Sequence, residues 1–337
     1  MVDIGGTNMR AAVVELSSTG SRIVLGPIEE RLRLRDGNRG VDATEFFMMQ
    51  ARLAAQLGAA RGLPVGYCFS YPSQTRPDRD AVLLRWTKNI EVPGVVGLEV
   101  GRALRSALEE VGLSPGPVRV LNDTVAALLA AAALEDSAWS RRDSIGLIVG
   151  TGTNTAAFFD SLEAPKLATY GTDTMAINLE SGNIDPPYLT EADDAVDAAS
   201  PNPGHQRFEK AVSGYYLPFV FKACRPEHEL DPKDGAGPLG KLAASNTKSP
   251  AQETARAILD RSADLVAASL CAVIDTYRHD TGPVGILAEG SLFWRAPGYA
   301  QRVEKTLSEL AGAERPFSIV RREDANLYGA ATAALTP

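Results

Sequence analysis

The chain has 337 residues, of which 45% are hydrophobic and 23% are charged, and its formal net charge at pH 7 is −8. This composition is typical of a globular protein with two domains or one large one. An acidic chain without a Lys/Arg-rich run is not expected to bind nucleic acid. No apolar stretch approaches the roughly 20 residues of a transmembrane helix, so no membrane partner is expected either.

The cysteines are few and scattered. Cys68, Cys224 and Cys271 have neither the spacing of a metal site nor that of a redox motif. No signal segment comes before the first glycine turn, so we expect reduced cysteines in a cytoplasmic protein. Only Met1-Val2 precedes Asp3, whereas a buried strand usually supplies roughly 4–6 apolar residues before such a turn; we therefore expect either a start codon upstream of Met1 or a truncated sequence.

Apolar runs of strand length alternate with amphipathic segments along the first half of the chain, which predicts an α/β fold. Asp42 is a candidate N-cap for one helix, and Gly112 a candidate C-terminal cap for the next. The predicted strands are 10–16, 23–32, 65–70, 82–86 and 118–121, and the predicted helices are 42–60, 96–112 and 124–134.

The second half continues the alternation. The acidic run from Glu191 to Asp197 is interpreted as a solvated loop or helix face, and the glycine-rich 235–240 segment follows no strand, which excludes a dinucleotide-binding turn. We predict a hairpin of strands 145–149 and 155–159, a helix over 207–222 that Pro218 should kink, a helix over 254–277, a strand at 284–288, and helices at 298–310 and 326–335.

Two short segments look alike. Ile4-Gly5-Gly6-Thr7-Asn8 and Gly150-Thr151-Gly152-Thr153-Asn154 each lie between two predicted strands. Glycine turns of this kind bring backbone N–H groups close to phosphate oxygens, and their threonines could add hydroxyl donors. The pattern predicts one hairpin repeated in two halves of a duplicated fold, although β-turns use these residues everywhere.

Two aspartates lie at predicted strand ends, where α/β folds bind ligands. Asp3 ends the first strand and could hold Mg²⁺ through water, or could be a simple turn residue. Asn122-Asp123 follows the strand 118–121 and begins a helix, so Asp123 could be either a catalytic group or only an N-cap.

Together these motifs resemble, in order, those of the hexokinase family, and the resemblance runs from residue 1 to about residue 335. The most specific is the Asn-Pro-Gly…Phe-Glu-Lys…Ser-Gly run. The motifs are 3–10 (DIGGTNMR), 86–88 (WTK), 122–124 (NDT), 150–154 (GTGTN), 202–217 (NPGHQRFEKAVSGYYL), 290–293 (GSLF) and the final 329–331 (GAA).

The resemblance implies an actin-like ATPase fold, which is an α/β duplicated fold with two domains around a central cleft. The small domain would be 1–121 with the last helix, 326–337, and the large domain would be 122–325. The implied reaction is transfer of the γ-phosphoryl group of ATP to the 6-hydroxyl of a hexose, with glucose expected, by a monomer or homodimer.

The resemblance also assigns residues. Asp123 would be the general base, and Asp3 would hold Mg²⁺ through water. The hexose would be bound by Ser70, Pro72, Thr87, Lys88, Asn122, Asn154, Glu180, Gln206 and Glu209. ATP would be bound by Gly5, Gly6, Thr7, Asn8, Arg10, Thr151, Gly152, Thr153, Gly214, Gly290 and Ser291.

The chain departs from the family pattern at a few positions. Ser181 replaces a tryptophan that usually follows the sugar-binding glutamate, which alters that wall of the pocket, and Glu289 replaces an aspartate. Two alternative interpretations stay open. One is a sugar kinase of the ROK group, although its cysteine-rich zinc motif is absent. The other is a non-catalytic sugar-binding regulator with the same fold.

Overall fold

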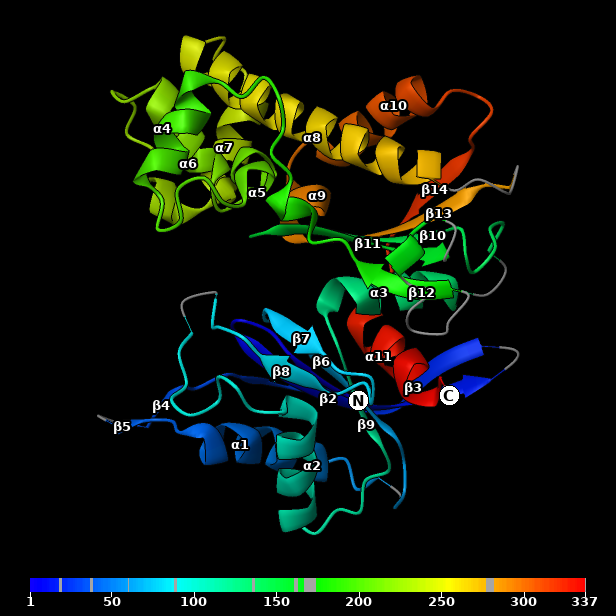
Figure 1. Cartoon of the computed structure of the whole chain (residues 1–337). Helices are drawn as coiled ribbons and strands as arrows, with labels where there is room; N and C mark the ends of the chain where they lie inside the picture. Colours follow the sequence, from blue (N-terminus) through cyan, green and yellow to red (C-terminus); the bar gives the residue numbers. More distant parts are fainter. Residues whose placement is uncertain are drawn as a thin grey trace. The chain divides into compact units, whose positions relative to one another are not determined.

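The computed structural model describes residues 1–17, 20–36, 39–59, 61–87, 90–134, 137–160, 163–166, 174–276 and 282–336. The chain forms two compact units (Figure 1). Unit 1 consists of Met1–Asp136 with Arg322–Pro337, and unit 2 of Ser137–Arg321. Each unit has its own sheet and its own apolar core.

The sheet of unit 1 has the strand order β3-β2-β1-β6-β9. β1, β2 and β3 form an antiparallel meander, while β6 and β9 run parallel to β1. The main strands are β1 (Val2–Ile4), β2 (Asn8–Ser17), β3 (Gly20–Arg31), β6 (Val65–Phe69) and β9 (Val118–Leu121), with short pairs β4 (Arg35–Asp36) with β5 (Arg39–Gly40), and β7 (Ser73–Thr75) with β8 (Ala81–Leu83).

The helices of unit 1 lie where the sequence predicts them, but α1 ends five residues before the predicted 60 and α2 begins four residues after the predicted 96. Asp42 caps α1 by accepting from the Glu45 N–H at 2.9 Å, and Gly112 follows α2 with a positive φ of 84°, as predicted. The helices are α1 (Ala43–Ala55), α2 (Val100–Glu110), α3 (Asp123–Ala132) and α11 (Ala325–Leu335).

The sheet of unit 2 repeats this scheme, with the order β12-β11-β10-β13-β14. The first three strands are an antiparallel meander, and β13 and β14 run parallel to β10. The predicted duplication is therefore present in the strand order and in the strand directions. The strands are β10 (Ser144–Val149), β11 (Thr153–Asp160), β12 (Thr174–Asn178), β13 (Val284–Glu289) and β14 (Phe317–Val320).

The helices of unit 2 pack around the long helix α8, which contacts α5, α6, α7 and α10. The 235–240 glycine segment lies largely in a helix, and α7 and α9 are elements that we did not predict. The helices are α4 (Glu191–Ala199), α5 (Arg207–Val212), α6 (Leu217–Cys224), α7 (Ala236–Ala244), α8 (Pro250–Thr276), α9 (Ser291–Arg295) and α10 (Tyr299–Ala311), with 3-10 turns η2 (Ser181–Asn183) and η3 (Pro232–Asp234).

One prediction in this unit was wrong, and another holds only in part. The segment 207–222 forms two helices, and Pro218 lies in the first turn of α6, where its missing N–H is tolerated, so it does not kink a longer helix. The acidic run forms the helix α4, on which Glu191 and Asp194 are exposed as the helix-face interpretation expects, but Asp193 is an exception. Asp193 is only 3% exposed and accepts from the Arg261 Nη2 at 2.7 Å, because Arg261 on α8 supplies the charge that its burial requires.

Helix α3 packs against α11 and belongs to unit 1. The predicted division assigned residues 122 onward to the second domain; as a division into functional domains it stays a prediction. Within the described residues, no helix is long and apolar enough to cross a membrane.

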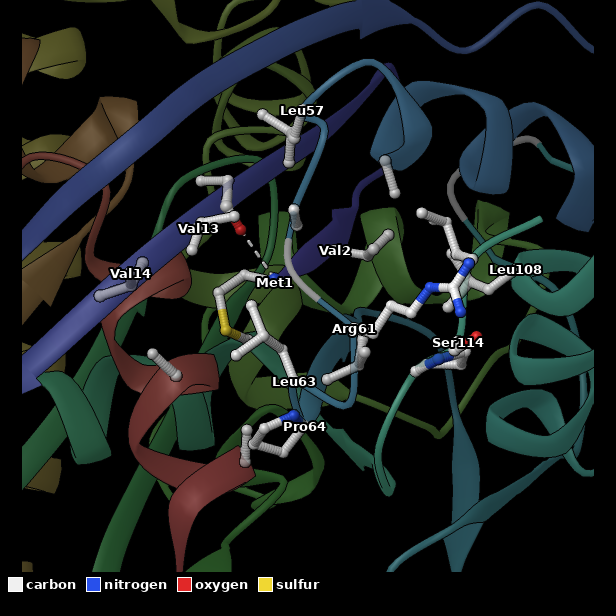
Figure 2. A pocket seen from close by; sticks show the side chains of 18 of the residues that line it. Met1, Val2, Val13, Val14, Leu57, Arg61, Leu63, Pro64, Leu108 and Ser114 are labelled. Carbon is white, nitrogen blue, oxygen red and sulfur yellow. Dashed lines mark hydrogen bonds between the residues drawn. The ribbon is translucent and has the colours of Figure 1, made fainter. Parts of the chain in front are cut away.

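Unit 1 contains a cavity of about 260 Å³ beside β1, between β2 and the start of β6. Figure 2 shows Met1, Val13 and Leu63 among the side chains around it. The Met1 amino group lies in these apolar surroundings and donates to the Ala12 carbonyl at 2.8 Å.

Candidate active site

Three parallel strands of unit 1 end at the same edge of the sheet. Asp3 on β1 is paired with Cys68 on β6, which is in turn paired with Leu121 on β9. Asp123 begins α3 just beyond β9. This edge therefore brings together the two aspartates that the sequence singled out.

The carboxylate of Asp3 is only 8% exposed, and Arg10 on β2 neutralises it. The Arg10 Nε donates to the Asp3 Oδ2 at 3.0 Å, and its Nη2 donates to the same oxygen. The Arg10 Nη1 donates to the Asp324 Oδ1 at 3.0 Å, at the start of α11. Arg10 is thus held between two carboxylates of its own unit.

Two buried side chains report the negative charge at this edge. Burial raises the pKa of the Cys68 thiol well above its usual value, and the charges of Asp3 and Asp123 raise it further. The same three causes raise the pKa of the Tyr71 hydroxyl, which donates to the Gly5 carbonyl at 2.7 Å. Neither Cys68 nor Tyr71 ionises at neutral pH.

The cap of α3 is Asn122, and Asp123 is the first residue inside the helix. The Asn122 Oδ1 accepts from the Thr124 N–H at 2.8 Å. Asp123 Oδ1 accepts from the same N–H at 2.9 Å and from the Thr124 hydroxyl at 3.3 Å. The sequence allowed Asp123 to be only the N-cap of this helix, but Asn122 largely performs that role.

The first glycine turn is tight, since the Gly5 N–H donates to the Asn8 carbonyl at 3.0 Å. Gly5 and Gly6 are half-buried, whereas Thr7 and Asn8 are exposed. The Asn8 amide donates to the Glu29 carboxylate at 2.6 Å. The turn offers its backbone and the Thr7 hydroxyl at the surface of unit 1.

Three of the predicted sugar-binding residues of unit 1 follow β6 and β8. Ser70 is 6% exposed, and its hydroxyl lies 4.0 Å from the Cys68 sulfur. Pro72 and Thr87 are half-buried. Thr87 follows Trp86, whose ring packs edge-on against the Tyr71 ring with 4.8 Å between the ring centroids. Lys88 lies outside the described residues.

The second glycine turn is surrounded by the other predicted nucleotide residues of unit 2. The Gly214 N–H donates to the Gly150 carbonyl at 2.8 Å. Gly290, with φ of 112°, lies so close that an added Cβ would be 2.2 Å from the Val149 carbonyl oxygen. Ser291 is the exposed first residue of α9, while Thr151 and Gly152 form the tip of the turn.

Thr153 belongs to the strand rather than to the tip of the turn. It is 7% exposed, its hydroxyl donates to the Ile148 carbonyl at 3.0 Å, and its N–H donates to the Glu209 Oε2 at 3.0 Å. An added Cβ on Gly152 would be 2.7 Å from the same oxygen. Glu209 thus links the predicted sugar site to the second turn.

An amide network holds the predicted sugar residues Asn154 and Glu180. The Asn154 amide donates to the Asn178 Oδ1 at 2.6 Å, and the Asn178 amide donates to the Glu180 Oε1 at 2.7 Å. Asn154 Oδ1 also accepts from the Ser181 N–H at 3.2 Å. Glu180 has the left-handed φ of 48° and is exposed, and Ser181 is buried where the family pattern has a tryptophan.

Gln206 and Glu209 lie on either side of the start of α5. Gln206 precedes the helix with a φ of 53°, and its Oε1 accepts from the Asn202 amide at 2.8 Å. Because α5 and β11 both pack against η2, unit 2 brings Asn154, Glu180, Gln206 and Glu209 into one region.

Sequence reasoning missed several residues that hold this site. Asn178 had a usable signal, since it is a polar residue two positions before Glu180. Lys210 lies inside the recognised 202–217 motif, but nothing in that motif indicates its burial. Cys68 and Asp324 gave no local signal, because their neighbours in the site are distant in sequence.

The duplicated sheet, with a glycine turn in each unit and carboxylates at the strand ends, is that of a sugar kinase with the actin-like ATPase fold. A hexokinase from Schistosoma mansoni, solved in complex with glucose, matches with a TM-score of 0.79 and 26% identity over 99% of this chain and 84% of that chain.

The hexokinase family model for the second half matches residues 144–224 and 242–336, and a second hexokinase model matches residues 1–133. Hexokinase of Kluyveromyces lactis is 28% identical over 393 residues, with 99% of this chain and 79% of that protein covered. Hexokinase-1 of Saccharomyces cerevisiae is 29% identical over 395 residues, with the same coverage. The chain belongs to the hexokinase family and is an ATP-dependent hexose kinase.

Proposed function

We propose that this enzyme transfers the γ-phosphoryl group of ATP to the 6-hydroxyl of glucose, with Asp123 as the general base. The 6-oxygen would attack the γ-phosphorus, its proton would pass to the Asp123 carboxylate, and the bond to the β-phosphate oxygen would break to release ADP. The observation that supports this role is the position of Asp123, at the edge where β1, β6 and β9 end, with the helix cap supplied by Asn122.

The residues at this edge fit a magnesium ion held through water. Mg²⁺ is typically bound by one or two carboxylates together with waters and phosphates, and in the described part of the chain no cluster of three or more acidic, cysteine or histidine ligands exists. Both Arg10 bonds to Asp3 go to Oδ2, which leaves acceptor capacity on the second oxygen. Asp3 would hold the ion, which would neutralise phosphate charge when bound.

For nucleotide binding, we propose the two glycine turns together with Gly214, Gly290 and Ser291. Thr153 is assigned a supporting role, because its N–H and hydroxyl bond to Glu209 and Ile148. Arg10 is likewise assigned a supporting role. Its guanidinium is held between Asp3 and Asp324, so it positions Asp3 and does not bind the phosphates directly.

For sugar binding, we propose Ser70, Thr87, Asn122, Glu180, Gln206 and Glu209, with Pro72, Lys88 and Asn154 beside them. Carboxylates and amides suit a hexose because each sugar hydroxyl both donates and accepts. We also infer a cytoplasmic enzyme, which the free thiols of Cys68, Cys224 and Cys271 support.

The test is Asp123→Ala, compared with Asp42→Ala at the cap of α1. Loss of a general base should lower kcat with ATP and glucose by about 10²–10⁴-fold, while the melting temperature changes little because Asn122 keeps the α3 cap. Asp42→Ala should cost about 0.5–2 kcal/mol of unfolding free energy and leave kcat unchanged.

A coupled assay of glucose phosphorylation and thermal unfolding measure both effects. An Asp123→Ala enzyme that keeps more than about a tenth of wild-type kcat would remove Asp123 from the base role. A wild-type protein that binds glucose without turning it over would instead be a sugar-binding regulator.

A further inference from the structure

Lys210 is a buried charged residue for which the proposed mechanism has no direct use. Its side chain is 2% exposed. Burying an ammonium group is unfavourable unless the charge is paired and its N–H groups are bonded. Lys210 meets both conditions: its Nζ donates to the Asp197 Oδ1 at 2.6 Å and to the Asn202 carbonyl at 2.8 Å.

The partners of Lys210 fix the loop that precedes α5. The Asp197 carboxylate, at the end of α4, also accepts from the Gly204 N–H at 2.9 and 3.1 Å. Burial by itself raises the pKa of Asp197, but the bonds from Lys210 and Gly204 outweigh it, so its pKa lies below the ordinary aspartate value. The carboxylate is therefore charged at neutral pH and holds both the lysine and the loop.

The loop ends on a residue in an unfavourable conformation. Gln206 has a φ of 53°, and a residue with a Cβ adopts the left-handed region only when its surroundings impose it. Here the Asn202 carbonyl is held by Lys210 and by the His205 N–H at 3.1 Å, while the Asn202 amide holds the Gln206 Oε1 at 2.8 Å. Each bond leads from the buried ion pair to the Gln206 side chain.

We propose that Lys210 is a positioning residue for hexose binding, which fixes Gln206 through Asn202 and Asp197. The inference rests on the proposed role of Gln206 in the sugar site. The buried ammonium group of Lys210 does not contact the sugar itself. The proposal therefore predicts that loss of this group weakens the affinity for the hexose and leaves the affinity for the nucleotide unchanged.

The experiment uses the full chain with three variants. Lys210→Met removes the ammonium, and Asn202→Ala removes the amide that holds Gln206 while leaving the backbone carbonyl for Lys210. The control is Lys222→Met on α6, because the Lys222 ammonium also donates to a backbone carbonyl, that of His228, but no proposed site residue depends on it.

Glucose binding is measured by calorimetry without ATP, and KM for ATP is measured by the coupled assay. We expect the glucose Kd to rise by about tenfold or more in Lys210→Met and in Asn202→Ala, since small displacements of positioning groups have effects of this size or larger. The KM for ATP should change by less than about twofold, and Lys222→Met should match the wild type in both measurements.

An unchanged glucose Kd in Asn202→Ala, or in a folded Lys210→Met, would overturn the proposal and leave the lysine a purely structural residue. If Lys210→Met does not fold, Asn202→Ala decides the matter alone. A wild-type chain that does not bind glucose would instead overturn the proposed function, and this inference with it.

Discussion

The two units use the same hairpin for different purposes. In unit 1 the last strand pair before the turn is Ile4 with Met9, so four residues, Gly5–Asn8, form the turn. In unit 2 the last pair is Val149 with Thr153, so the turn has three residues. The sequence repeat aligns Asn8 with Asn154. Because the second turn is one residue shorter, these two residues do not occupy equivalent positions in the two hairpins.

By position in the hairpin, the pair Asp3–Arg10 corresponds to the pair Ile148–Asn154. Unit 1 thus has an ion pair where unit 2 has an apolar side chain and an amide. Arg10 neutralises the carboxylate beside the first turn, whereas Asn154 holds the loop of Glu180. The duplicated sheet supplies a fixed position, and the residue pair at that position decides whether it carries an ion pair or an amide that holds the loop of Glu180, a proposed sugar-binding residue.

The most direct way to break this comparison is to copy the pair of unit 2 into unit 1. In Asp3→Ile with Arg10→Asn, we expect kcat to fall by at least about 10²-fold, the scale on which loss of one preorganised charge-stabilising group acts. Stability should fall less than in a variant that removes only one partner, because no buried charge is left unpaired at position 3, although Asp324 loses its bond from Arg10. Glucose phosphorylation and urea unfolding measure the two effects.

The matched control for this exchange is Arg10→Met alone. It leaves the Asp3 carboxylate buried without its partner, a change that costs about 3–5 kcal/mol in fully buried pairs and less here, because Arg10 is 24% exposed. An active double variant would show that the two pairs are interchangeable, whereas an Arg10→Met variant as stable as the double one would show that the Asp3 carboxylate does not need its partner.

The dependence of stability on pH gives a second test of the comparison between the two units. In unit 1 the buried ion pair lies beside the glycine turn, whereas in unit 2 the buried Asp193–Arg261 pair lies away from it. Burial by itself raises the pKa of Asp193, but bonds from Arg261 and Thr190 outweigh it and lower the pKa below the ordinary aspartate value. The unfolded chain then takes up this proton at a higher pH than the folded one. The contribution of Asp193 is complete above about pH 4 and is lost as the pH falls through the lowered pKa.

The measurement is urea unfolding at a series of pH values from about 5 downward, followed by Trp294 and Trp139 fluorescence in a Trp86→Phe background. Asp193→Asn should be less stable than the parent at pH 5, and the difference should shrink as the solution becomes more acidic. A constant difference between the two would exclude the Asp193–Arg261 pair as the source.

The smallest expected effect concerns the cavity of unit 1 (Figure 2). Ala334 on α11 lines it and is 6% exposed. Ala334→Leu should raise the unfolding free energy by about 1 kcal/mol, since each buried methylene contributes about 0.8 kcal/mol and some is lost to repacking. Trp86 fluorescence reports unit 1, and the exposed Ala313→Leu is the control. A lower melting temperature would mean that the cavity cannot accept the larger side chain.

The fold could be predicted well where the determining interactions are local. The glycine turns, the strand 118–121 and the caps at Asp42 and Gly112 depend on residues within a few positions, and the structure has each of them. The same holds for the duplication, because the repeated hairpin has a visible sequence pattern. The split into α5 and α6 was missed because Pro218 at a helix start and Pro218 at a kink give the same sequence signal.

Long-range pairing explains what the sequence could not show. Asp193 is an ordinary acidic residue until Arg261, 68 positions later, lies beside it. Only Asp123 was considered as a cap of α3, although Asn122 is an equally good capping residue, and the end of β9 at Leu121 makes Asn122 the cap. The predicted site residues came from recognised motifs, whereas their supporting partners Asn178 and Lys210 are visible only in three dimensions.

The adjacency of Asn122 and Asp123 has an evolutionary consequence. Since the helix is capped by one residue and the proposed proton acceptor is the next, a single codon change at position 123 would silence the chemistry while the protein still folds and still holds its sugar. A duplicated gene could therefore give rise to a glucose sensor in one mutational step, without passing through an unstable intermediate.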